Sequence, residues 1–392
     1  MTRGPARAGA VALAGFTTFL SLYTPQPILP LIADSLGVAE AATGGTITAA
    51  LVAVALVAPF AGAISDRVGR KRLIVGACLL LAVPTLLAAG AQSLEALLLW
   101  RFLQGLALPF IFTVTVAYVG DEAKGADGLR LAGIYGIGTI LGGFGGRLVA
   151  GLAAEIAGWR AGFVAIGLFT LAAGVAVAVL LPAERRFQPQ RGGLRGLLAT
   201  WRAHLGNARL VATCFVGFLM LFSNVAVYTF VTLHLAAPPF ALSPAAMALV
   251  FAVYLVGAAT TVVATRLAIR FGRRATLGLA AGLAGAGLVL SLVPSLVAVV
   301  AGLAMLSGGL LVVQTLALGF LGVAVERGRS AAVGMYVTTY YVGGALGGLV
   351  PALAWQAAGW PGVAALVLPA IAVMGVLGWR FWGEPAGAAT RR

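Results

Sequence analysis

The chain has 392 residues, of which 61% are hydrophobic and only 9% are charged. A soluble globular domain is about 25% charged, so this chain has too little polar surface to cover a core in water, and lipid is the expected solvent. The formal net charge is +15, but the basic residues are spread thinly between apolar runs, with no stripe interleaved with aromatic residues, which argues against nucleic acid as a partner.

Few residues suit metal or redox chemistry. The two cysteines, Cys78 and Cys214, lie inside apolar runs and are expected to be small buried hydrophobic residues. The two histidines, His204 and His234, have no Cys, Asp or Glu at ligand spacing. The sequence therefore predicts neither a metal site nor a cofactor.

Apolar runs long enough to cross a membrane follow one another along the chain. About 20 apolar residues are needed, and in lipid each backbone group must bond within its own segment, so the runs are expected to be helices. Arg3 and Arg7 precede the first run, which has no clean cleavage site and is expected to remain as a helix. The twelve predicted spans are 9–32, 44–64, 73–91, 96–119, 130–153, 160–181, 210–233, 245–267, 275–293, 297–320, 331–354 and 361–381.

Lysine and arginine collect on one side of the predicted spans. That side receives 23 of the 26 basic residues, and the other receives only Arg160 beside four acidic residues. These acids are Asp34, Glu40, Glu95 and Glu155. The positive-inside rule then predicts that both termini are cytoplasmic, which requires an even number of spans. The polar stretch 182–209 is expected to be a cytoplasmic linker that lies on anionic headgroups.

An internal repeat divides the chain. Residues 133–159 and 334–360 are identical at 12 of 27 positions at an offset of 201, and weaker echoes link 16–24 to 215–223 and 68–71 to 271–274. Two similar six-helix halves, 1–181 and 210–392, are therefore predicted on either side of the linker. This all-α membrane arrangement, with twelve transmembrane helices in two pseudo-symmetric bundles, resembles the major facilitator superfamily.

The loop between the second and third predicted spans resembles the superfamily's loop signature. Gly62 is expected to permit close helix approach, Asp66 to cap the next helix and pair with an arginine across the halves, and Gly69 to allow a tight turn. Such a cluster would latch a gate in one state, whereas the alternative is a plain positive-inside loop. Ile269 replaces the aspartate in the second half, so any latch is asymmetric. The predicted gating residues here are Gly62, Asp66, Arg67, Gly69, Arg70 and Arg72.

Arg101, Gln104 and Gly105 in the fourth span resemble a motif that is linked to proton coupling in drug antiporters. An arginine inside an apolar helix costs about 2.5–3.5 kcal/mol, so it should face protein or a water-filled cavity. The alternative is a structural arginine that bonds the carbonyl groups of a neighbouring helix.

Gly142, Gly143, Gly146 and Arg147 in the fifth span resemble the glycine-rich motif of antiporters. Small residues there are expected to let helices approach closely and slide. Gly143 stands where the family usually has proline, which puts a kink-based leak barrier in doubt.

A substrate cavity is expected where the first, fourth, seventh and tenth spans meet, as the resemblance implies. At about 1.5 Å rise per residue, Gln26, Arg101 and Arg147 share the periplasmic half of the membrane. The predicted cavity residues are Tyr23, Gln26, Arg101, Asn224, Tyr228, Gln314, Tyr336 and Tyr340. The tyrosines have an alternative role as packing residues or interfacial anchors.

No Asp or Glu lies within a predicted span, which favours neutral, amphipathic or anionic substrates over cations. The resemblance to the twelve-helix drug:proton antiporter branch implies a monomeric inner-membrane secondary transporter. It would export a small organic molecule by proton-coupled alternating access, with protons and membrane lipid as its other partners.

Three alternatives are open. The first is uptake or exchange of a small anionic metabolite held by Arg101 and Arg147. The second is a non-transporting sensor or a channel built on the same fold. The third is a membrane enzyme, which is disfavoured. An enzyme would need convergent acid, base or metal groups within the spans, whereas the spans offer only arginines, amides, hydroxyls and phenols.

Overall fold

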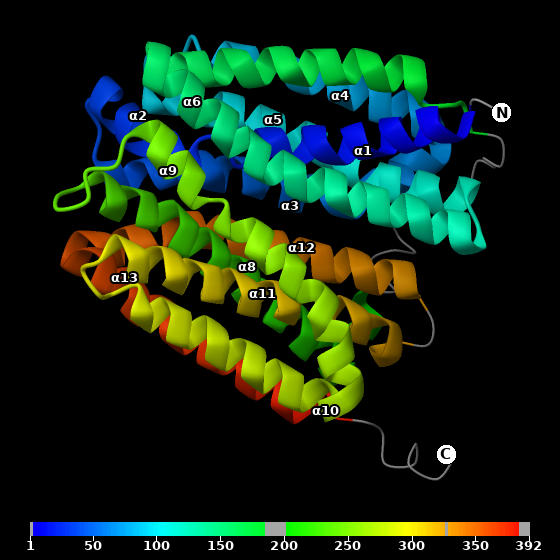
Figure 1. The fold of residues 1–392 in the computed structure, drawn as a ribbon. Helices are drawn as coiled ribbons and strands as arrows, with labels where there is room; N and C mark the ends of the chain where they lie inside the picture. Colours follow the sequence, from blue (N-terminus) through cyan, green and yellow to red (C-terminus); the bar gives the residue numbers. More distant parts are fainter. Residues whose placement is uncertain (1–2, 185–200, 326–327, 384–392) are drawn as a thin grey trace.

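The protein's structure, a computed structural model, describes residues 3–184, 201–325 and 328–383, and these ranges contain helices and no strand. The helices lie side by side in a bundle (Figure 1). The helices before the linker are α1 (Arg3–Leu22), η1 (Gln26–Ile28), α2 (Leu29–Leu36), η2 (Glu40–Gly44), α3 (Gly45–Val68), α4 (Arg70–Ala88), α5 (Leu94–Glu122) and α6 (Gly125–Leu180). Those after it are α8 (Ala208–Ala236), α9 (Pro244–Val250), α10 (Val253–Leu290), α11 (Leu296–Ala324), α12 (Arg329–Leu349) and α13 (Pro351–Phe381).

Nine helical stretches of the described residues are long and apolar enough to cross a membrane. Three long helices are each interrupted by a glycine with positive φ, namely Gly158 in α6, Gly272 in α10 and Gly359 in α13. Glycine adopts this conformation without the steric cost that other residues pay. Figure 1 shows α6 turning back at its break, so the predicted spans 130–153 and 160–181 are two helical arms on either side of Gly158. The breaks are compatible with the predicted count of twelve, which stays a prediction.

The first predicted span is not one helix. The structure divides 9–32 into α1, η1 and α2. Pro25 precedes η1, while Pro27 and Pro30 each stand in the first turn of a new helix. Proline lacks the N–H that a helix interior requires, so the prolines account for this division.

The predicted repeat corresponds to a repeated helix contact. Gly142 of α6 lies against the carbonyl group of Phe16 in α1, and Gly343 of α12 lies against the carbonyl group of Phe218 in α8. A Cβ atom at either glycine would collide with that backbone. One helical turn further on, Gly146 meets Leu20 and Gly347 meets Phe222 in the same way. The predicted close approach is therefore seen at Gly142 and Gly146, whereas a Cβ atom at Gly143 would make only ordinary contacts.

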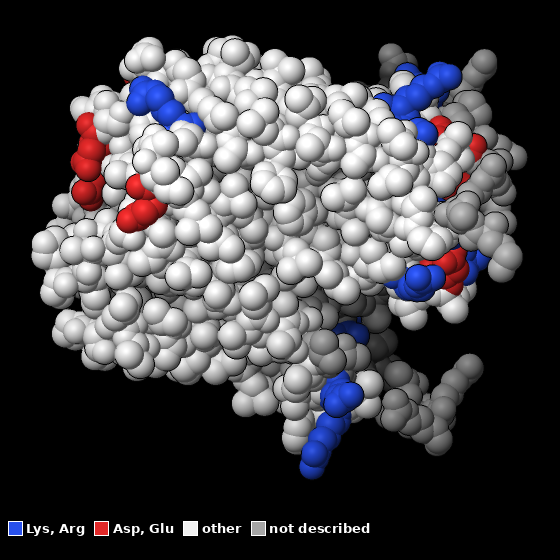
Figure 2. Space-filling view, turned by 45° about the horizontal axis from the view of Figure 1, so that its top comes forward, with Lys and Arg blue, Asp and Glu red and all other residues white. Residues whose placement is uncertain are grey.

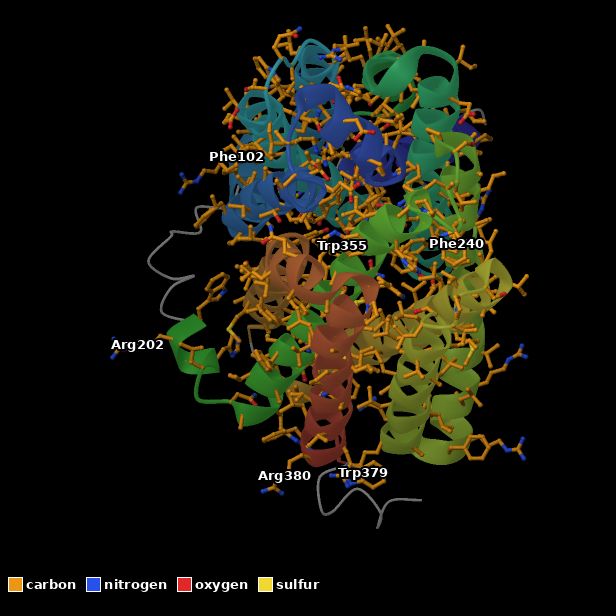
Figure 3. All side chains as sticks on the ribbon, turned by 90° about the vertical axis from the view of Figure 1, so that its left-hand side faces the viewer. Phe102, Arg202, Phe240, Trp355, Trp379 and Arg380 are labelled. Carbon is orange, nitrogen blue, oxygen red and sulfur yellow. The ribbon has the colours of Figure 1, made fainter. Side chains whose placement is uncertain are left out.

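The helices form two groups, which we call the first group (α1 to α6) and the second group (α8 to α13). Within the first group α1 packs on α6 and α3 on α5, and within the second α8 packs on α12 and α10 on α11. Figure 3 shows the first group above the second, with Trp355 and Phe240 near their boundary. The polar stretch between the groups is described only at 182–184 and 201–209, so most of the predicted amphipathic linker lies outside the described residues.

Charged side chains gather at the two ends of the bundle. On the face that Figure 2 shows, lysine, arginine and some acids lie at one end, acids lie mainly at the other, and a broad belt between them carries no charge. We call the end with the Arg67–Arg72 loop the basic end and the end with Asp34, Glu40 and Glu155 the acidic end. An uncharged belt of this kind suits the hydrocarbon core of a bilayer.

Candidate functional site

A cavity of about 230 Å³ lies between the first and second groups. Polar side chains from both groups line it, and none of the lining residues that the structure describes carries a carboxylate. Its described lining comprises Phe19, Tyr23, Thr139, Ile140, Gly143, Phe144, Arg147, Met220, Leu221, Asn224, Tyr254, Leu311, Gln314, Tyr340 and Tyr341. Four predicted cavity residues are therefore in place, namely Tyr23, Asn224, Gln314 and Tyr340. Gln26, Arg101, Tyr228 and Tyr336 are buried outside this lining.

Arg147 is the cation of this cavity, and its side chain is held on several sides. Its Nε donates to Oε1 of Gln26 at 2.8 Å and its Nη1 donates to the carbonyl oxygen of Gly143 at 2.7 Å. The guanidinium carbon lies 4.7 Å from the ring centres of Tyr23, Phe251 and Tyr254. Ring faces attract a desolvated cation, which offsets part of the cost of burying it. The predicted shared depth of Gln26 and Arg147 is confirmed by their direct contact.

No acid neutralises this guanidinium. Arg147 is only 2% exposed, yet it forms no ion pair with any described residue. Within the described chain its Nη2 also donates no hydrogen bond, although two of its other nitrogens do. A buried charge without a counterion is costly to keep in a membrane protein, which makes Arg147 a candidate functional residue.

Arg147 also connects the two groups, because it belongs to α6 while Phe251 and Tyr254 belong to the second group. Three hydrogen bonds add to this connection among the described residues, all of them towards the acidic end. Gln26 donates to Thr229 at 3.3 Å, Thr48 donates to the Ala345 carbonyl oxygen at 2.8 Å, and the Ala245 amide donates to Glu155 at 3.2 Å. The acidic end of the cavity is thus closed by contacts between the groups.

In the second copy of the repeat, Gly348 occupies the position of Arg147. Gly348 packs against Thr48 and Gly44 of the first group, where a Cβ atom would collide. One copy therefore supplies a buried charge, and the other supplies a close contact between the groups.

Arg101 is fully buried, and all three of its guanidinium nitrogens donate hydrogen bonds, mainly to neighbouring backbone. Its Nε donates to the Thr46 carbonyl oxygen at 3.0 Å and its Nη1 donates to that of Ser21 at 2.9 Å. It also donates to Leu22 and to Gln104. These bonds join α5 to α1 and α3, as the structural alternative for this residue requires, while a part in proton coupling stays a prediction. Gly105 lies against the Ala50 carbonyl group, so it also serves the contact of α5 with α3.

A cluster of phenols and amides lies in the cavity wall and directly behind it. Tyr254 donates to Oδ1 of Asn224 at 2.9 Å, and its ring centre lies 4.4 Å from that of Tyr228. Tyr228 donates to the Leu303 carbonyl oxygen at 2.8 Å. Gln314 donates to the Tyr340 hydroxyl at 3.0 Å. The ring of Tyr336 stacks on that of Tyr340, with their centres 5.9 Å apart, so these two side chains lie on one face of α12.

Sequence reasoning missed Tyr254, Tyr341 and Phe251. Tyr254 is the only tyrosine in the predicted span 245–267, so its polarity in an apolar run was a usable signal. Tyr341 directly follows a predicted cavity residue and lines the same space. Phe251 has no polar group that would have distinguished it from packing residues.

The predicted loop contacts are partly wrong. Asp66 pairs with Arg70 of its own loop at 2.6 Å, and no side chain caps the start of α4. Arg70 also contacts Asp121 at 3.0 Å, so the described ion pairs stay within the first group. Gly62 faces open space, so it does not permit the close helix contact that we expected. The predicted turn at Gly69 is confirmed by its φ of 104°.

Comparison with known proteins gives consistent matches. Residues 11–238 match the family model described as Major Facilitator Superfamily. The inner membrane transport protein YnfM of Escherichia coli K12 is 30% identical over 373 residues, which cover 95% of this chain and 89% of that protein. The uncharacterized MFS-type transporter YybF of Bacillus subtilis is 28% identical and covers 90% of this chain and 88% of its own length. The crystal structure of the nucleoside transporter NupG superposes with a TM-score of 0.76 at 16% identity, covering 95% of this chain and 99% of that one.

Proposed function

Because the chain belongs to the Major Facilitator Superfamily, as a multi-pass membrane transporter of a small molecule and not an enzyme, we propose that it exports a small organic molecule with proton coupling. The proposed units are 1–181 and 210–392, joined by the linker 182–209, in a monomer with both termini in the cytoplasm. The observation that supports this proposal is the cavity that both groups line. In it Arg147 of the first group contacts the rings of Phe251 and Tyr254 of the second group.

Alternating access follows from the position of these contacts. If the basic end faces the cytoplasm, the contacts at the acidic end separate the cavity from the periplasm. Release to that side requires Arg147 to leave the rings of Phe251 and Tyr254 and requires the three inter-group hydrogen bonds to break. Each such bond contributes about 0.5–1.5 kcal/mol, so a bound substrate could offset the loss.

A second candidate is uptake or exchange of a small anion. The guanidinium of Arg147 carries the only described charge in the cavity lining, and its Nη2 has a free donor there. A carboxylate or phosphate forms strong charge-assisted hydrogen bonds with such a donor. Arg101 supports this candidate less, because its donors are already engaged by the backbone.

Flux measurements test the proposal. The purified chain would be reconstituted in proteoliposomes and given a panel of lipophilic dyes and small aromatic carboxylates, with and without an imposed pH gradient. Proton-coupled export is supported if substrate flux rises with the pH gradient and if a protonophore returns it to the rate measured without a gradient. Gradient-independent flux of carboxylates alone, with counter-exchange, supports the anion candidate. Single-channel currents, or no flux of any compound, would instead favour a channel or a sensor.

A further inference from the structure

A second hollow, distinct from the central cavity, lies on the outer surface of the first group between α4 and α5. It has a volume of about 670 Å³. We call it the α4/α5 groove. Its lining comprises Arg72, Leu73, Gly76, Ala77, Leu80, Val83, Pro84, Trp100, Leu103, Leu106, Ala107 and Phe110. None of these residues lines the central cavity.

The groove is apolar, open to the surroundings and concave. Leu80 and Val83 are 62% and 52% exposed, so its rim faces outward. The space beside Gly76 of α4 is open, because a Cβ atom there would meet nothing within 4 Å. In a membrane protein such a surface faces lipid, and a concave apolar surface holds one hydrocarbon chain in more contacts than a flat one.

A single cation lies at one end of the groove. Arg72 is in the first turn of α4 at the basic end and is exposed, and it forms no ion pair with a described residue. The nearby acids are engaged elsewhere, since Asp66 and Asp121 contact Arg70 and Glu184 accepts from the Lys71 amide. The charge of Arg72 is therefore available to a ligand at the membrane surface.

The length of the groove suits one lipid leaflet. Arg72 and Pro84 are both in α4, and at about 1.5 Å rise per residue they lie roughly 18 Å apart along the helix. The hydrocarbon core is about 30 Å thick, so one leaflet is about half of that. A chain that starts at the level of Arg72 would therefore run along the groove to the middle of the bilayer.

We propose that the α4/α5 groove binds an anionic phospholipid, with an acyl chain between α4 and α5 and the phosphate on Arg72. The pairing of one cation with a long apolar groove matches the two parts of such a lipid. An anionic headgroup is favoured over a zwitterionic one, because choline would place a second cation near the guanidinium. Basic pockets between transmembrane helices on the cytoplasmic side commonly hold such headgroups.

Native mass spectrometry of the full chain in detergent tests the proposal, with phosphatidylglycerol and phosphatidylcholine as competing probes. The wild type should bind one phosphatidylglycerol in preference to phosphatidylcholine. Arg72→Gln should weaken that binding about fivefold, the loss expected for one basic residue at a membrane surface. Gly76→Trp should fill the groove and also remove the preference, with Gly76→Leu as a smaller filling variant.

Two matched controls define the outcome. Gly278→Trp adds the same ring to α10, at another glycine that meets nothing within 4 Å. Arg380→Gln removes a charge that points away from the bundle at the end of α13 (Figure 3). Both controls should keep the wild-type lipid preference. The proposal is overturned if the wild type binds both lipids equally, or if either Arg72→Gln or a folded Gly76 variant retains the preference.

Discussion

At the residue scale, two buried arginines in one apolar bundle have different surroundings. The donors of Arg101 reach backbone carbonyl groups of two neighbouring helices, whereas Arg147 faces aromatic rings and retains a free donor in a cavity. The first arrangement fixes helices in place. The second allows a competing ligand to replace weak ring contacts, so the proposal gives substrate binding to Arg147 and a structural role to Arg101.

Replacing Arg147 with Gln should loosen the acidic end. The shorter amide cannot reach the rings of Phe251 and Tyr254, and cation–π contacts contribute about 0.5–2 kcal/mol each. A Thr229→Cys reporter should then react with a membrane-impermeant maleimide on the order of tenfold faster. The same reporter with Arg160→Gln, a surface change at the same end, should react at the parent rate. Equal rates for both variants would contradict the role of Arg147 in holding the groups together.

Replacing Arg101 with Lys should destabilise the protein although the charge is kept. A lysine ammonium cannot reach the carbonyl groups of Thr46 and Ser21 together, because it lacks the planar fork of a guanidinium. Each buried carbonyl left without a donor costs about 1–3 kcal/mol. Thermal unfolding in detergent should show a Tm several degrees lower than that of Arg380→Lys, an exposed control. An unchanged Tm would mean that these bonds do not support the fold.

At the scale of helices, glycine spacing sets the distance between paired helices. Gly142 and Gly343 occupy equivalent places in the two copies of the repeat, and each lets one helix touch the backbone of another. Without a hydrophobic driving force between helices in lipid, this close contact is a main source of their association. The sequence repeat therefore records a packing requirement that occurs twice.

Gly142→Ala and Gly343→Ala should each lower the Tm, because a single methyl group would strike the carbonyl group of Phe16 or Phe218. Gly136→Ala in the same helix α6 is the control, since a Cβ atom there meets nothing within 4 Å. That control should be neutral or gain up to about 1 kcal/mol from the better helix propensity of alanine. Fluorescence-detected size-exclusion after heating would measure all three. Equal heat resistance in the three variants would show that the close contacts are dispensable.

At the scale of the whole molecule, the proposed alternating access predicts that the acidic end opens and closes during transport. The hydrogen bond from Thr48 to the Ala345 carbonyl oxygen lies in the inter-group contact between α3 and α12. A disulfide between Thr48→Cys and Ala345→Cys should hold this end shut. We expect oxidation to abolish flux in proteoliposomes and a reducing agent to restore it, while each single cysteine variant keeps its flux under both conditions. Full flux in the oxidised double variant would show that this end need not open.

The sequence predicted those features of the fold that follow from the order of residues along the chain. The apolar runs, the repeat and the glycine-rich contacts of α6 and α12 were predictable, because they follow from local periodicity and spacing. The common depth of Gln26 and Arg147 was predictable, whereas their direct contact is visible only in the structure. The rotation of each helix about its axis depends on the neighbouring helices. The sequence alone therefore could not show that Arg101 faces backbone or that Tyr254 reaches the cavity. For the same reason Asp66 was assigned a partner across the halves and is found beside Arg70.

The exchange of Arg147 for Gly348 between the two copies has an evolutionary consequence. Two identical chains paired around a twofold axis would carry either two guanidinium groups or two glycines at these places. Two arginines would leave no room for the contact with Thr48 and Gly44, and two glycines would leave the pocket uncharged. Fusion of the copies into one polypeptide removes this conflict. A division of labour of this kind is open only to a duplicated gene whose halves have been free to diverge.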